Sequence, residues 1–154
     1  MVTSGKDYAL VARTVWFFSS GIGRASAVLT QRALYLFPEH TFAAGATTRT
    51  KTDFTIGGRR PYDAISALVA SPETSADALE QQLGEWACQV EGPIALQLAG
   101  VKRIRIFNGW FRRGVAFSEK ESGYDLRPKS LRPTKQEMPA FIEMLKDRPG
   151  TELK

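Results

Sequence analysis

The stretch IALQLAGVKRIRIFNGWFRRGVAFS, residues 94–118, predicts two β-strands joined at Asn108-Gly109. Asn-Gly between two apolar runs is a strong hairpin signal, because both residues tolerate the positive φ of a type I′ turn. The apolar positions that alternate along the two arms are Val101, Ile104, Ile106, Phe111, Val115 and Phe117. The hairpin also carries five cationic side chains within twelve residues, namely Lys102, Arg103, Arg105, Arg112 and Arg113.

These five cations, together with Trp110 at the expected tip, form the candidate binding site of the sequence. Their charges could contact the phosphates of lipid headgroups or an acidic protein surface, with Trp110 as an interfacial anchor. One alternative is an ordinary solvated strand face whose charges discourage edge aggregation. Another is that the cations pair with an acidic helix of the same chain.

The length and composition indicate a single folded domain over residues 1–154. Hydrophobic residues make up 43% of the chain and charged residues 24%, as in an ordinary soluble protein. No apolar run approaches the roughly 20 residues of a membrane span, and the N-terminal stretch lacks the order of a signal peptide. The single cysteine, Cys88, fits a reducing compartment and is expected to be a small buried side chain. We therefore expect a cytoplasmic protein.

The net charge of +5 is unevenly distributed along the chain. Residues 61–100 carry six Asp or Glu and no Lys or Arg, whereas the segments before and after them carry net charges of +5 and +6. An acidic island between basic flanks suggests an inserted or separately packed element. Its clearest part is an acidic helical segment at about 70–92.

Two amphipathic helices are expected. The first has its apolar residues at Leu79, Leu83, Trp86, Ala87 and Val90. Its N-cap is either Thr74 with Asp77 or Ser75 alone. The second helix is C-terminal, with a capping-box pattern at Thr134 and Glu137, a start near Met138 and a frayed end at 147–154.

The remaining elements are expected to be short strands at 8–18, 24–37, 41–56 and 123–131. Residues 24–37 fit either one bent strand or a tight strand pair, and residues 61–69 fit either a strand or a helical turn. Because the chain shows no alternation of strands and helices, the sheet should be antiparallel. A mainly-β fold with a minor helical part follows.

Catalytic and cofactor chemistry find little support in the sequence. His40 is the only histidine, in an expected loop beside Pro38, and no spacing suggests a metal site or a nucleophile with its base. The stretch SSGIGRASA at 19–27 is similar to the nucleotide-binding turn of short-chain dehydrogenases, but a strand pattern follows where a helix is required. We therefore expect no enzyme activity, no cofactor and no metal. We also expect no specific nucleic-acid partner, because neither helix is basic.

Three segments together resemble bacterial PH-like domains of the PH/GRAM type. They are GRASAVLTQRALYLF at 23–37, RIRIFNGWFRRGVAFS at 103–118 and YDLRPKSLRPTKQEMPAFIEML at 124–145. The resemblance implies a partly open antiparallel barrel of two near-orthogonal sheets, capped by the C-terminal helix. The acidic segment at about 70–92 departs from that pattern, and we expect it to be an inserted helix.

The function expected from this reading is a non-enzymatic interaction module that binds a protein partner not yet identified, as an adaptor, an immunity-type inhibitor or a self-associating homo-oligomer. The alternative is peripheral recognition of anionic lipid or phosphate by the basic hairpin at 102–113.

Overall fold

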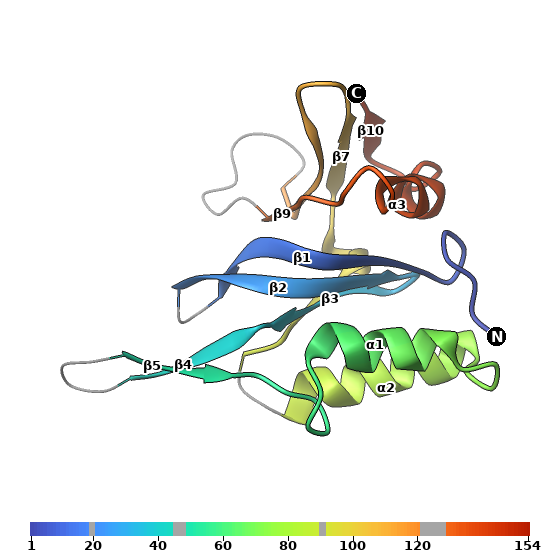
Figure 1. Ribbon diagram of the computed structural model, residues 1–154. Coiled ribbons are helices and arrows are strands. Elements are labelled where there is room, and N and C mark those ends of the chain that lie inside the picture. The colour runs from blue at the N-terminus through green and yellow to red at the C-terminus, as the bar shows by residue number, and fades with distance from the viewer. Residues whose placement is uncertain (19–20, 45–48, 90–91, 121–128) are drawn as a thin grey trace.

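The computed structural model describes residues 1–18, 21–44, 49–89, 92–120 and 129–154 (Figure 1). The described part is mainly β, as expected. Its elements are β1 (Tyr8–Phe18), β2 (Gly21–Thr30), β3 (Ala33–Pro38), β4 (His40–Ala44), β5 (Arg49–Asp53), α1 (Pro61–Ala70), α2 (Ala76–Gln89), β6 (Ile94–Gln97), the short 3₁₀ helix η1 (Leu98–Gly100), β7 (Arg103–Asn108), β8 (Arg113–Ser118), β9 (Lys129–Leu131), α3 (Met138–Leu145) and β10 (Thr151–Leu153).

The first sheet has the strand order β1-β2-β3-β6 and is antiparallel throughout. Residues 24–37 form a tight strand pair, because Thr30 closes the turn between β2 and β3. Its hydroxyl donates to the Ala33 carbonyl and accepts from the Ala33 N–H, both at 3.2 Å. All six residues of β3 are buried, so both faces of this sheet are covered.

Helices α1 and α2 cover one face of the first sheet (Figure 1). Of the two structures expected for residues 61–69, strand or helical turn, the helix is the one that forms. Pro61 lies in its first turn, where the missing N–H costs nothing. Ser75 alone caps α2, since its hydroxyl accepts the Ala78 N–H at 3.1 Å, whereas Thr74 donates to the Leu68 carbonyl. Leu79 and Leu83 are buried against the sheet, as predicted; Val90 lies outside the described residues. Most of the acidic island thus forms the helices α1 and α2, and its last residues form β6 and η1.

The opposite face of the first sheet packs against a second sheet, ordered β10-β7-β8-β9, and against α3. Leu36, Ile106, Val115 and Phe141 meet in this core, and each is fully buried. The strands pair antiparallel except β10, which runs parallel to β7. The expected frayed end at 147–154 and the wholly antiparallel sheet are therefore wrong. Gly150, at φ 81°, allows the chain to turn back from α3 into β10.

The capping box at the start of α3 is confirmed. Thr134 Oγ1 accepts the Glu137 N–H at 3.2 Å, and Glu137 Oε1 accepts the Thr134 N–H at 2.8 Å. Glu137 Oε2 also accepts the Ala12 N–H at 2.8 Å, at an irregularity in the pairing of β1 with β2. One carboxylate therefore joins the helix start to the first sheet.

The described sheets are not closed into a barrel. They stack in layers, with the α1–α2 pair on one side of the first sheet and the second sheet with α3 on the other (Figure 1). A third sheet contains only the hairpin of β4 and β5. Within the described residues, no helix has the length and apolar character needed to cross a membrane.

Candidate functional site

The tip of the β7–β8 hairpin differs from the expected Asn-Gly turn. Asn108 pairs with Arg113, and the Gly109 N–H donates to the Arg112 carbonyl at 2.9 Å. Trp110 and Phe111 therefore occupy the turn itself. Neither Asn108 nor Gly109 has a positive φ, so the prediction of a type I′ turn at these residues is wrong.

Trp110 and Phe111 are the most exposed aromatic side chains that the structure describes, each at 91%. Their ring centroids lie 4.5 Å apart, so they form one apolar knob at the end of the hairpin. Phe111 was expected on the apolar face of the second strand, and that prediction is wrong. Two neighbouring large aromatics that are exposed to water make this knob a candidate contact surface, because they do not contribute to the core.

The arginines next to this knob are held close to it. The Arg112 guanidinium lies 4.0 Å from the centre of the Phe107 ring, in a cation–π contact. Arg112, Arg113 and Arg132 then line one side of the tip. The hollow between them has a volume of about 320 Å³, and we call it the arginine hollow. Its lining residues are Phe107, Phe111, Arg112, Arg113, Gly114, Val115, Ala116, Ser130, Leu131 and Arg132.

The floor of the arginine hollow consists of small residues on the outer face of β8 and β9. Gly114 and Ala116 alternate with the buried Val115, and Ser130 lies opposite Ala116. A Cβ atom at Gly114 would lie 2.9 Å from the Leu131 carbonyl oxygen, so the close approach of β9 requires glycine there. The small floor keeps the hollow open.

The structure does not bring the five predicted cations into one cluster. Arg103 pairs with Ser118 at the base of the hairpin, five residues before Asn108, which places it roughly 17 Å from the tip. Lys102 precedes it and is exposed. Arg105 is half-buried midway along β7. Only Arg112 and Arg113 accompany Trp110.

Pairing of the basic hairpin with the acidic helix is excluded by the fold. Helix α2 packs on β3 and β6, on the far side of the first sheet from the hairpin (Figure 1). Its Glu80 accepts a hydrogen bond of 2.7 Å from the Tyr35 hydroxyl instead. Burial and this carboxylate raise the pKa of Tyr35 above its ordinary value.

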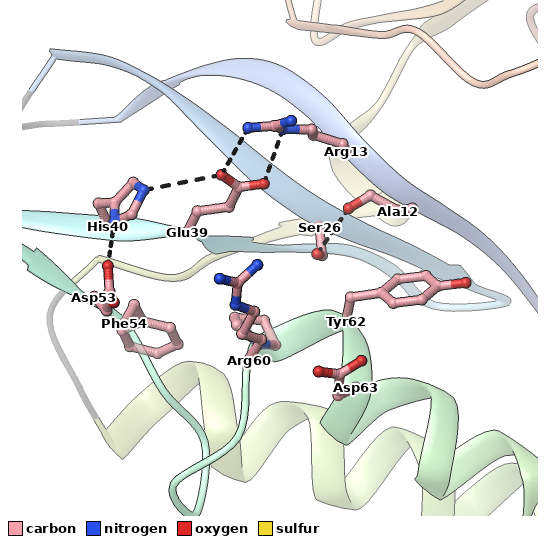
Figure 2. A pocket seen from close by; sticks show the side chains of 11 residues that line it. Ala12, Arg13, Ser26, Glu39, His40, Asp53, Phe54, Arg60, Tyr62 and Asp63 are labelled. Atoms are coloured by element: carbon pink, nitrogen blue, oxygen red, sulfur yellow. Dashed lines mark hydrogen bonds and ion pairs between the residues drawn. The ribbon is translucent and has the colours of Figure 1, made fainter.

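A second cavity, of about 450 Å³, lies between β1, the β3–β4 junction and the start of α1 (Figure 2). Arg13, Glu39 and His40 line one wall, and Arg60 and Asp63 come from the start of α1. We call this cavity the charged cleft. Its volume is within the usual range of small-molecule pockets. Whether it is a candidate ligand site therefore depends on whether its charged side chains are free to contact a ligand.

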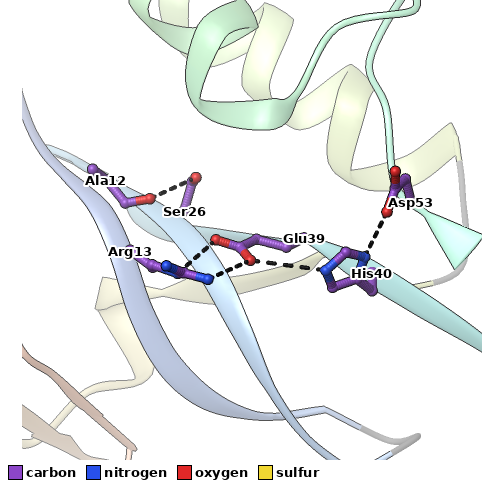
Figure 3. Close-up of polar contacts among 6 residues, drawn as sticks. All are labelled: Ala12, Arg13, Ser26, Glu39, His40 and Asp53. Atoms are coloured by element: carbon purple, nitrogen blue, oxygen red, sulfur yellow. Dashed lines mark hydrogen bonds and ion pairs between the residues drawn. The ribbon is translucent and has the colours of Figure 1, made fainter. Parts of the chain in front are cut away.

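Most charges of the charged cleft are satisfied by one another (Figure 3). Arg13 Nε lies 3.1 Å from Glu39 Oε1, and His40 Nδ1 lies 2.8 Å from Asp53 Oδ1. The geometry of the second contact does not meet that of a hydrogen bond, so it is a close polar contact. His40 begins β4 and pairs in register with Asp53, so its expected loop position is wrong.

The contacts of Arg13 with Glu39 and of His40 with Asp53 therefore hold the β4–β5 hairpin beside β1. Among the charged residues that the structure describes in this lining, only Arg60 and Asp63 lack an ion-pair partner, and their charges are opposite. No group of three His, Cys, Asp or Glu in the described part of the chain could hold a metal ion. The hairpin tip is the better candidate site, because its exposed groups are apolar or of one sign.

Sequence reasoning missed two contributors to the tip, Phe111 and Arg132. Arg132 follows β9, and only the pairing of β9 with β8 places it beside Arg113, so no local pattern could reveal it. Phe111 could have been found by considering the hairpin register in which Asn108 pairs with Arg113, because that register places Phe111 in the turn. Cys88, expected to be buried, is exposed in the last turn of α2.

No protein-family model, curated protein or solved structure matches this chain.

Proposed function

We propose that this protein binds the surface of an anionic membrane peripherally, through the tip of the β7–β8 hairpin. The observation that carries the proposal is the pair Trp110 and Phe111, each 91% exposed, next to Arg112 and Arg113. Aromatic rings favour the depth of lipid headgroups, where an apolar ring can leave water without losing all polar contacts. Arginine forms paired hydrogen bonds with phosphate oxygens at the same depth.

The distribution of charge supports one orientation on the membrane. The six carboxylates of residues 61–100 belong largely to α1 and α2, which lie beyond the first sheet from the hairpin (Figure 1). A negative surface would therefore attract the hairpin and repel the opposite side of the molecule. Each cation near an anionic surface contributes about 1 kcal/mol, and this attraction falls off within a Debye length.

The test is flotation of the purified protein with neutral and with anionic vesicles, at low and at high salt. We expect binding only to anionic vesicles, and weaker binding as salt rises. Arg112→Glu with Arg113→Glu removes two attractions and adds two repulsions, which should cost about 4 kcal/mol, or about 1,000-fold in affinity. Its thermal transition should stay nearly unchanged, because both side chains are exposed.

Arg59→Glu with Arg60→Glu is the matched control, since it makes the same change of charge at two adjacent exposed arginines outside the hairpin. The control should bind anionic vesicles nearly as the unmodified protein does. If both double variants lose binding equally, the net charge and not the hairpin tip is responsible, and the proposal fails.

A second candidate function is a protein-binding module, as an adaptor, an immunity-type inhibitor or a self-associating homo-oligomer. The observation in its favour is the composition of the tip, because Trp and Arg are the residues that most often dominate protein interfaces. An apolar protein contact should persist at high salt, whereas vesicle binding through exposed cations should not. Absence of flotation under every condition would favour this candidate.

The finer description of the fold as PH-like is also a proposal. It is supported by the mainly-β composition and by α3, which packs on a sheet near the C-terminus. We further propose that the protein is a non-enzymatic cytoplasmic module. A cytoplasmic location fits the anionic lipid of the cytoplasmic leaflet and the single free cysteine.

A further inference from the structure

We propose that the arginine hollow binds a terminal phosphate group, the phosphomonoester of a lipid headgroup. This inference rests on the proposed membrane function and names the ligand chemistry of the same site. Arg112, Arg113 and Arg132 all line one hollow, and none of its described lining residues is acidic. Their charges repel one another, and an anion between them would remove that repulsion.

The partners of these arginines leave their guanidinium groups available. Arg112 contacts the face of the Phe107 ring, which orients the group without occupying its N–H donors. Neither Arg113 nor Arg132 forms an ion pair with another described residue. Phe107 orients Arg112 and the paired strands fix the floor of the hollow, so the side chains left to be ordered when a phosphate binds are those of Arg113 and Arg132.

The charge of the hollow selects the kind of phosphate. A phosphomonoester carries a charge of about −1.5 to −2 at neutral pH and offers three acceptor oxygens. A phosphodiester carries a single negative charge and fewer free oxygens. Three arginines with planar, forked donors match the monoester better, and the volume of about 320 Å³ has room for it. The neighbouring Trp110 and Phe111 place this hollow at headgroup depth.

Vesicles of phosphatidylcholine that contain either phosphatidic acid or phosphatidylserine, matched in surface charge, test the inference by flotation. Phosphatidic acid presents a phosphomonoester, whereas phosphatidylserine presents a phosphodiester. We expect the unmodified protein to bind the phosphatidic acid vesicles about tenfold more tightly. Arg132→Gln should abolish this preference. Its binding to phosphatidylserine should fall only by the roughly fivefold that one surface cation contributes, because the knob and its two adjacent arginines remain.

Lys102→Gln is the matched control, since it removes one charge from the exposed base of the same hairpin. It should keep the preference for phosphatidic acid. Equal binding to both vesicles by the unmodified protein would overturn the inference and leave the membrane function standing. A preference that Arg132→Gln retains would also overturn it.

Absence of flotation on both vesicles would overturn the membrane function, and the lipid source of the phosphate with it. Calorimetry with glycerol 3-phosphate then examines the hollow alone. Binding that Arg132→Gln abolishes would support a phosphate site for a soluble monoester. No heat of binding in the unmodified protein would overturn the phosphate site as well.

Discussion

Trp110→Ala tests whether the exposed knob enters the membrane. The side chain is 91% exposed, so its removal should leave the free energy of unfolding unchanged. An aromatic side chain has about 200 Å² of surface, of which about 180 Å² is open to water at 91% exposure, and full burial of that area at about 25 cal/mol per Å² would contribute about 4.5 kcal/mol. If the headgroup region covers about half of that surface, the loss is about 2 kcal/mol, or about 30-fold in vesicle affinity.

Vesicle titration followed by sedimentation measures this loss at a fixed salt concentration. Tyr62→Ala provides the control, because Tyr62 is an aromatic side chain exposed at the start of α1, at 41%. It should alter affinity by less than about twofold, since a side chain that stays in water contributes no burial. A Trp110→Ala variant that binds as tightly as the Tyr62→Ala control would refute insertion of the knob.

Two further predictions concern the fold that presents the hairpin. Glu137→Ala leaves the N–H groups of Ala12 and Thr134 without their acceptor and should lower the free energy of unfolding in urea by about 2 kcal/mol. The control is Glu143→Ala, which removes an exposed pair with Lys146 and should change the free energy of unfolding little. Equal effects of the two substitutions would contradict the role given to Glu137. The pKa of Tyr35 is higher in the folded protein than in the unfolded chain, so the folded protein keeps this proton at a pH where the unfolded chain loses it. The contribution of Tyr35 to the free energy of unfolding is therefore complete below about pH 10 and is lost as pH rises. The stability advantage over Tyr35→Phe should therefore shrink by about 1.4 kcal/mol between about pH 9 and pH 11, and a constant difference in urea unfolding would contradict the raised pKa.

The sequence predicted best the elements whose signals are local. The capping box at Thr134 and Glu137 and the apolar stripe of α2 both depend on residues within a few positions of one another. The sequence did not decide between helix and strand for residues 61–69, because about nine residues make too short a window to separate a buried helix from a strand. The strand β10 has only three residues, and its parallel pairing with β7 depends on the chain's path after α3.

The candidate site was half predicted. Arg112, Arg113 and Trp110 were expected at the hairpin and lie at its tip, but Asn-Gly was the wrong turn. The hairpin instead pairs Asn108 with Arg113, which moves both aromatics into the turn. The contribution of Arg132 comes from pairing between β8 and β9, and such long-range pairing is set by packing rather than by local sequence.

The most direct test of the central claim is quenching of Trp110 fluorescence by vesicles that contain brominated lipid. Trp16 is buried in the core. Trp86, on α2, packs edge-on against Phe37 of β3, so neither tryptophan should reach lipid. We expect quenching with anionic brominated vesicles, no quenching with neutral ones, and no quenching in Trp110→Phe. If Trp110 fluorescence stays unchanged with anionic brominated vesicles, under conditions where the protein floats with them, membrane contact through the hairpin tip is contradicted.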